Sequence, residues 1–280
     1  MRRILLAALV FIAASVVIFP PANAVTYGKL DGNAHPAVVL LLMEVGGRPA
    51  FRCSATLLSP TVVLTAGHCT NNFPESPYTG MRVFTESDVQ AGIGITNNYP
   101  NAGPNAVEAA AWHAHPSYPD APFFVHDVGV VILQSPINLA PSAYGVLPAV
   151  NQFDALKTPR GQKDLTFTAV GYGLQQSFPD QASFLANNTR TRYSATPQLL
   201  QINVPGFTGN FSMLLSNNAK TGGTCFGDSG GPNFYSSGSS ETKIVAGVTS
   251  FGVNGNCAGT GGVFRMDRQD VLDFVTSYLP

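Results

Sequence analysis

Residues 227–232 read GDSGGP and place Ser229 among three glycines. Glycine lacks a Cβ, so this stretch can form a tight turn with positive φ that points successive backbone N–H groups outward. Such N–H groups can bind an oxyanion. A serine hydroxyl is a weak nucleophile at neutral pH, so it needs a base that a carboxylate holds in place. The chain must therefore supply a histidine and an acid elsewhere.

Two other segments supply these groups. His68 lies in the stretch TAGHC, directly after an apolar run that is typical of a strand. Asp127 opens the apolar run VGVVIL, and an acid at the start of a buried strand needs a hydrogen-bonded partner, which an imidazole provides. His68, Asp127 and Ser229 are therefore the candidate catalytic residues.

The order of these residues argues against another serine hydrolase pattern. The segment around Ser229 also fits the G-x-S-x-G turn of α/β-hydrolases, in which the acid and then the histidine follow the serine. The histidines stand at positions 35, 68, 113, 115 and 126, so none follows Ser229. The chain does not fit the α/β-hydrolase order.

The three segments, in the order His68, Asp127, Ser229, resemble the catalytic segments of the trypsin/chymotrypsin-like serine proteases. TAGHC and GDSGGP match the two signature strings of that family residue for residue, while DVGVVIL and GYG resemble its D-I-A-L-L strand and G-W-G turn. The resemblance implies an all-β fold of two perpendicular six-stranded antiparallel β-barrels, with the active site between them. It spans the whole chain after residue 24.

The resemblance also implies a serine endopeptidase that hydrolyses peptide bonds through an acyl-enzyme. Ser229 would attack the carbonyl, His68 would carry the proton, and Asp127 would hold the imidazole tautomer. The backbone N–H groups of Gly227 and Ser229 would bind the oxyanion. The alternative is a catalytically inactive protease-like binding module, which usually lacks the serine or the histidine.

The implied specificity pocket has Gly223 at its base, Ser250 and Gly252 along one wall, and Gly262 behind that wall. No Asp or Glu occurs from residue 248 to residue 262. An Arg or Lys side chain would bury its charge there without a partner, which costs several kcal/mol. We therefore expect cleavage after neutral residues with apolar or aromatic side chains.

The first 24 residues predict a secretory signal peptide. Arg2 and Arg3 precede a 16-residue apolar run, and the segment ends in the A-x-A cleavage sequence Ala-Asn-Ala. An apolar run of 16 residues is short for a membrane-spanning helix. We expect a secreted protein that begins at Val25.

Activation in the resembled family usually pairs a new apolar N-terminal amine with the acid before the catalytic serine, which is Asp228 here. The stretch VTYG that begins at Val25 resembles the usual I-V-G-G start and lies 43 residues before His68. Signal-peptide removal would then release the activating amine, without a separate propeptide.

Four cysteines in an exported chain predict two disulfides, and their spacing alone leaves three pairings open. The resemblance implies Cys53–Cys69 beside the base and Cys225–Cys257 beside the substrate pocket. With no C-x2-C pair, a zinc site on the cysteines is not expected. His113 and His115 could share one strand face, but no acid or cysteine lies close by in the sequence, which favours a surface pair without metal.

Composition agrees with these expectations. Short β-branched runs alternate with turn formers, which predicts an all-β domain over residues 25–280. We expect one barrel over about 25–140, a second over about 160–265, and a helix over about 267–279. Asp267 would cap that helix, whose apolar residues recur at i, i+3, i+4 and i+7.

The net charge of -1 with no basic run predicts neither nucleic acid nor membrane as a partner. The resemblance implies protein or peptide substrates, and proteinaceous inhibitors as further partners. We expect a monomer without cofactor or metal.

Overall fold

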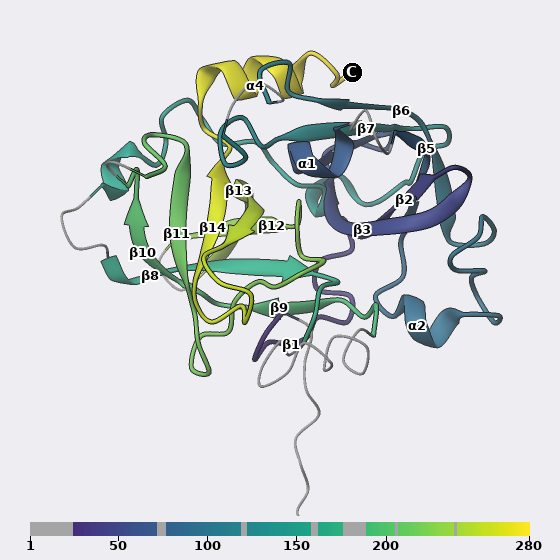
Figure 1. Cartoon of the computed structure of the whole chain (residues 1–280), viewed down its shortest axis with the longest axis horizontal. Helices are drawn as coiled ribbons and strands as arrows, with labels where there is room; N and C mark the ends of the chain where they lie inside the picture. Colours follow the sequence, from purple (N-terminus) through teal and green to yellow (C-terminus); the bar gives the residue numbers. More distant parts are fainter. Residues whose placement is uncertain are drawn as a thin grey trace, which may run out of the picture.

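A computed structural model describes residues 25–71, 77–118, 122–157, 162–175, 189–204, 207–237 and 240–280. These residues form two antiparallel barrels side by side, with a helix at the C-terminus (Figure 1). The predicted signal peptide, residues 1–24, lies outside the described residues. No helix in the described part is long and apolar enough to cross a membrane.

The first barrel closes through six strands. In spatial order they are β2 (Val38–Val45), β3 (Arg48–Leu57), β4 (Val62–Thr65), β7 (Gly129–Leu133), β6 (Ala106–Ala114) and β5 (Tyr78–Phe84). Alternate side chains of β2 pack in two different clusters: Leu41 and Met43 inside the barrel, Leu40 and Leu42 towards the second barrel. Because both faces of β2 are buried, its sequence VVLLLM is apolar without alternation.

The second barrel also closes through six strands. They are β8 (Gln162–Gly171), β10 (Gln198–Ile202), β11 (Ser212–Asn217), β14 (Gly259–Arg265), β13 (Ser240–Gly252) and β12 (Pro232–Ser237), and β12 pairs back onto β8. Strands β9 (Tyr193–Ala195) and β1 (Lys29–Leu30) extend the sheet beside β8. The fold is therefore the expected pair of six-stranded barrels.

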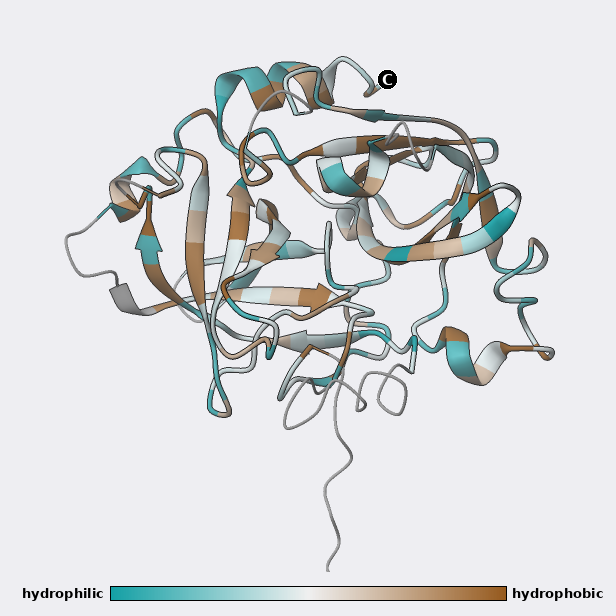
Figure 2. Ribbon diagram, in the orientation of Figure 1, coloured by the Kyte–Doolittle hydropathy of each residue, from teal (hydrophilic) through white to brown (hydrophobic). Residues whose placement is uncertain are grey.

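The helical segments of the described chain are short. They are α1 (Gly67–Thr70), α2 (Val89–Gly92), η1 (Pro141–Ala143), η2 (Asp154–Leu156) and α4 (Gln269–Thr276). Helix α4 buries Val271 and Val275 in the cluster that joins the two barrels. Figure 2 shows that this helix carries both hydrophobic and hydrophilic residues.

Helix α4 is shorter than the predicted 267–279, and Asp267 does not cap it. The Asp267 carboxylate accepts hydrogen bonds from Arg265 Nε at 2.9 Å and from the Phe153 N–H at 2.8 Å. Arg268 occupies the N-cap position without a side-chain hydrogen bond. The capping prediction was wrong because the Asp267 carboxylate instead compensates the charge of the fully buried Arg265 guanidinium.

Candidate active site

Neighbouring strands bring His68 and Asp127 together. Strand β4 leads into α1, which carries His68, and β4 pairs with β7, which Asp127 precedes. The His68 N–H donates to Asp127 Oδ1 at 2.9 Å, and the His68 Nδ1 lies 3.0 Å from Asp127 Oδ2. Asp127 is fully buried. The carboxylate thus fixes both the backbone and the ring of the histidine.

The ring of His68 is electrostatically tuned by this contact. Burial lowers the pKa of His68, but the charge of Asp127 and its hydrogen bond together outweigh burial, so the pKa lies above its ordinary value. The Ser250 hydroxyl also donates to Asp127 Oδ2, at 2.5 Å. A second donor leaves the buried carboxylate better satisfied than His68 alone would.

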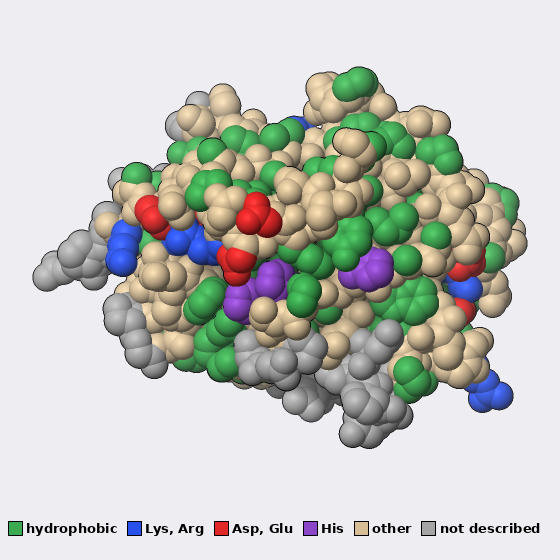
Figure 3. Space-filling view, turned by 90° about the horizontal axis from the view of Figure 1, so that it is seen from above, with side chains coloured by type: hydrophobic (Ala, Val, Ile, Leu, Met, Phe, Trp, Pro, Cys, Tyr) green, Lys and Arg blue, Asp and Glu red, His purple; other side chains and the backbone are tan. Residues whose placement is uncertain are grey.

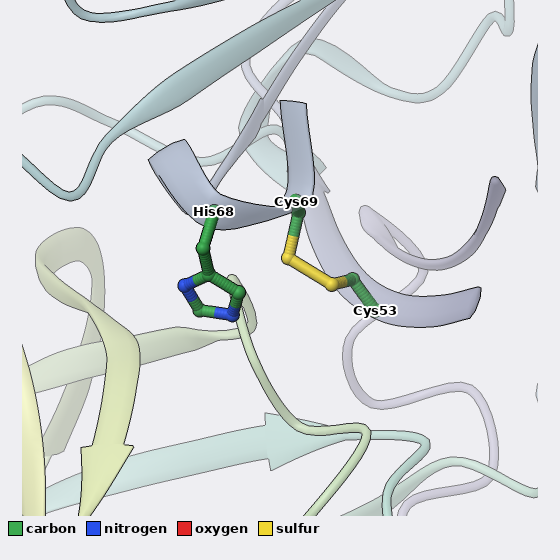
Figure 4. Close-up of side chains that lie close together, drawn as sticks. All are labelled: Cys53, His68 and Cys69. Carbon is green, nitrogen blue, oxygen red and sulfur yellow. A yellow bond between two sulfur atoms is a disulfide. The ribbon is translucent and has the colours of Figure 1, made fainter. Parts of the chain in front are cut away.

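A disulfide stands beside the histidine. Cys53 on β3 is bonded to Cys69 on α1, and Figure 4 shows this bridge next to the imidazole of His68. A second disulfide joins Cys225 to Cys257. These are the two pairings that the family resemblance implies.

The glycine-rich turn around Ser229 has the expected positive φ. Gly227 has φ +93° and Gly230 has φ +74°, and a Cβ at Gly230 would clash with Thr65. The Ser54 N–H donates to Ser229 O at 2.8 Å, and the Ser54 hydroxyl donates to Gly227 O at 2.9 Å. Within the described residues, neither the Gly227 N–H nor the Ser229 N–H donates a hydrogen bond. These are the two N–H groups that the family resemblance implies for an oxyanion.

Ser229 lies at a pocket of about 360 Å³. The residues that line this pocket are Thr224, Cys225, Phe226, Ser229, Thr249, Ser250, Phe251, Gly252, Asn254, Gly255 and Cys257. None of these residues carries a formal charge. Ser250 and Gly252 line it as expected, whereas Gly223 and Gly262 are not among its lining residues.

The other two predicted pocket positions face different neighbours. A Cβ at Gly223 would run into the side chain of Asn217, which occupies that space. A Cβ at Gly262 would run into the ring of Phe251, whereas one at Gly261 would lie 3.1 Å from the Thr224 hydroxyl. Thr224 and Phe251 both line the pocket, so each of these two glycines lies next to a side chain of the pocket wall.

Asp228 is fully buried directly before Ser229. Its carboxylate accepts from the Gly173 N–H at 2.8 Å and from the Cys225 N–H at 2.9 Å. Burial raises the pKa of Asp228 to about 7, because it outweighs these hydrogen bonds and the nearby charge of Arg52. No hydrogen bond or ion pair joins Asp228 to Val25 among the described residues.

The N-terminal segment nevertheless packs close by. Val25 is fully buried against Tyr193 and Ala195. The Gly223 N–H donates to Thr26 O at 3.1 Å. The segment that would carry a free amine thus contacts the stretch that precedes Asp228.

Sequence reasoning missed an aromatic cluster beside the pocket. The ring of Phe251 packs against Phe123, Phe124 and Phe207, with centroids 5.6, 6.0 and 5.8 Å apart. Phe123 and Phe207 are largely exposed. The adjacent pair of phenylalanines at 123 and 124, outside any apolar strand, is the signal that points to this surface.

Two antiparallel barrels with a histidine–aspartate pair and a glycine-framed serine define the class of trypsin-like serine proteases. The chain belongs to the trypsin family, since the Trypsin family model matches residues 29–273.

Similar proteins agree with this membership. A trypsin from Saccharopolyspora erythraea is 29% identical over 241 residues, which cover 85% of this chain and 91% of the relative. A glandular kallikrein from Sus scrofa is 26% identical over 216 residues, covering 76% and 81%. The solved structure of HL collagenase matches with a TM-score of 0.65 and 19% identity over 90% of this chain and 97% of its own. That likeness shows the fold alone.

Proposed function

We propose that this chain is a secreted serine endopeptidase that hydrolyses peptide bonds through an acyl-enzyme. The observation that carries the proposal is the double hydrogen bond between His68 and Asp127, combined with Ser229 on the wall of an uncharged pocket. Ser229 Oγ attacks the peptide carbonyl, and His68 takes its proton and later delivers it to the leaving amine. The N–H groups of Gly227 and Ser229 stabilise the oxyanion.

The nucleophile is tested by covalent labelling. A sulfonyl fluoride should modify the protein once, and mass spectrometry of its peptides should place the label on Ser229. Ser229→Ala should abolish labelling and peptide hydrolysis, whereas Ser277→Ala, at an exposed serine after helix α4, should change neither. An active Ser229→Ala variant would refute the assignment. An unlabelled, inactive parent would favour the protease-like binding module.

The pocket favours a neutral side chain at the position before the cleaved bond. Its polar groups, from Thr224, Ser250 and Asn254, are all uncharged, so a buried Lys or Arg would lack a counter-charge there. Cleavage of a peptide library should follow apolar or aromatic residues. Dominant cleavage after Lys or Arg would contradict this specificity.

The buried state of Asp228 supports activation by the amine of Val25. Burial raises the pKa of the Asp228 carboxyl and so disfavours its charged form. An ammonium group beside it would stabilise the charged carboxylate. Signal peptidase would generate this amine on export, and the active protein should begin at Val25 by N-terminal sequencing. Full activity in a variant with one extra residue before Val25 would rule out the pairing.

The proposed enzyme acts on proteins or peptides outside the cell. Proteinaceous inhibitors that bind the same pocket are its further expected partners, and the chain is proposed to act as a monomer. Secretion is consistent with its two disulfides, since disulfides persist in oxidising compartments.

A further inference from the structure

Three metal-ligating side chains meet where the end of β6, the segment before β7 and helix α4 come together. They are His115, His126 and Asp270, and one ligand atom from each lies within 4.8 Å of the others. The two imidazole rings stack with centroids 4.5 Å apart and planes 9° from parallel. His126 Nε2 lies 2.9 Å from Asp270 Oδ2.

The cluster is partly open to solvent. His115 is buried, whereas the side chains of His126 and Asp270 are 18% and 52% exposed. Figure 3 shows histidine side chains next to acidic ones on the face seen from above, where helix α4 lies. An ion can therefore reach these side chains without opening the fold.

One ring nitrogen of each histidine is available for coordination. His126 Nδ1 is buried and has no hydrogen-bond partner in the described part of the chain. The Ser117 N–H donates to His115 Nδ1 at 3.2 Å, a bond that coordination through this nitrogen would replace.

We propose that His115, His126 and Asp270 bind a zinc ion. Two imidazoles and one carboxylate form a three-ligand set typical of Zn²⁺, with water in the fourth position. Ca²⁺ and Mg²⁺ prefer ligand sets made of oxygen atoms. With zinc–ligand bonds of about 2.0–2.2 Å, the ligand atoms of a tetrahedral site lie about 3.3–3.6 Å apart. His126 Nε2 and Asp270 Oδ2, now 2.9 Å apart, would separate slightly and turn toward His115, which rotations of these two partly exposed side chains can supply.

A second group with suitable ligand types, Cys53, His68 and Cys69, does not qualify. Its two sulfur atoms are bonded to each other in a disulfide and are not thiolates (Figure 4).

Bound zinc would connect two distant parts of the chain. His126 is the residue directly before Asp127, and Asp270 lies 144 positions further along, in the first turn of α4. The ion would thus fix the backbone beside Asp127 to the C-terminal helix. The proposal concerns binding and does not depend on the proposed peptidase activity.

The test is zinc titration of the full secreted chain, produced without a histidine tag. Isothermal titration should show one Zn²⁺ per chain, the midpoint of thermal unfolding should rise with zinc, and Ca²⁺ should do neither. Co²⁺ in place of zinc should give the absorption bands of a four-coordinate site. Absence of stoichiometric zinc binding by this protein would overturn the proposal.

Variants locate the ion. Asp270→Asn keeps the side-chain shape, and His126→Asn suits the positive φ of 54° at that position; each should weaken zinc affinity by more than about tenfold. Two control variants should leave the zinc affinity unchanged: His113→Gln, at an exposed neighbouring histidine, and His68→Ala. Metal-free circular dichroism establishes that each variant folds. Unaltered affinity in both folded site variants, or its loss in His113→Gln or His68→Ala, would refute the assignment.

Discussion

Asp228 is fully buried and His68 is partly buried, and the surroundings of each residue shift its pKa upward. For Asp228 the cause is burial, which raises the pKa to about 7. For His68 the cause is the charge of Asp127, which outweighs burial. A raised pKa means that the folded state binds the proton more tightly than the unfolded chain does.

The first prediction concerns Asp228 before the amine of Val25 is free. Its folded pKa of about 7 exceeds the unfolded value of 3.8, so the free energy of unfolding should fall as pH rises from about 4 to about 7. Each unit of pKa shift corresponds to about 1.4 kcal/mol. Urea denaturation of a chain with residues retained before Val25 should show this loss, and Asp228→Asn should flatten it. Parallel pH profiles for the two chains would contradict the prediction.

The second prediction concerns His68, which in the proposed mechanism accepts the proton of Ser229 and must be neutral to do so. Because its pKa is raised, kcat/KM should increase with pH through a midpoint above 6.5. Asp127→Asn should lower kcat by about 10⁴-fold and move the midpoint down, since burial then acts without the opposing charge. Asp273→Asn, at an exposed carboxylate of α4, serves as the control. A midpoint that stays in place in Asp127→Asn would show that the carboxylate does not set the histidine pKa.

At the scale of elements, strands β13 and β14 determine which residues face the pocket. A β-bulge between Thr249 and Phe251 shifts their register, so that Phe251 pairs with Gly262 and Gly252 pairs with Gly261. Gly262 therefore lies against the ring of Phe251, next to the wall that Ser250 and Gly252 form. The sequence pattern alone does not reveal the bulge that creates this pairing.

The third prediction compares Gly252, which lines the pocket, with Gly223, which does not. A Cβ at Gly223 would clash with Asn217, whereas one at Gly252 meets only Asn254 O, at 3.4 Å. Gly223→Ala should therefore lower the melting temperature, while Gly252→Ala should leave it nearly unchanged and raise KM for substrates with large side chains. Differential scanning calorimetry and steady-state kinetics measure both effects. Equal melting temperatures for the two variants would show that the Asn217 side chain can move away from the new Cβ without loss of stability.

Local sequence signals were strongest where one short segment carries the function. The candidates His68, Asp127 and Ser229 were predicted from the segments TAGHC, DVGVVIL and GDSGGP. The structure places His68 and Asp127 in contact. Partners from distant elements could not be predicted this way. Ser250 was expected only as pocket wall, and Asp270 joins His126 because helix α4 folds back across the barrels.

At the scale of the whole molecule, Arg192 ties the N-terminal segment and the first barrel to the second. Its side chain is 1% exposed, and its Nε donates to Asp31 at 2.8 Å. A second nitrogen donates to Val38 O at 2.8 Å, on strand β2. Asp31 also contacts His35, so one buried ion cluster joins segments that are more than 150 residues apart.

The fourth prediction follows from this cluster. Arg192→Leu should reduce the free energy of unfolding by about 3–5 kcal/mol, because it leaves the buried Asp31 charge undercompensated. Adding Asp31→Asn should restore part of that loss. Arg48→Leu, at an exposed arginine of β3, should change stability by less than about 0.5 kcal/mol in the same chemical denaturation experiment. A loss no larger than that of Arg48→Leu would show that the cluster is not stabilising.

Closure of both barrels has a further consequence for a protein proposed to cleave polypeptides. A strand held on both sides in a ladder cannot detach alone to enter an active site, because its hydrogen bonds break only with those of its neighbours. Proteolytic nicking concentrates instead at exposed loops and chain ends. If the proposed peptidase activity holds, copies of the protein that meet in solution should cut one another in the connections between strands and leave the barrels whole.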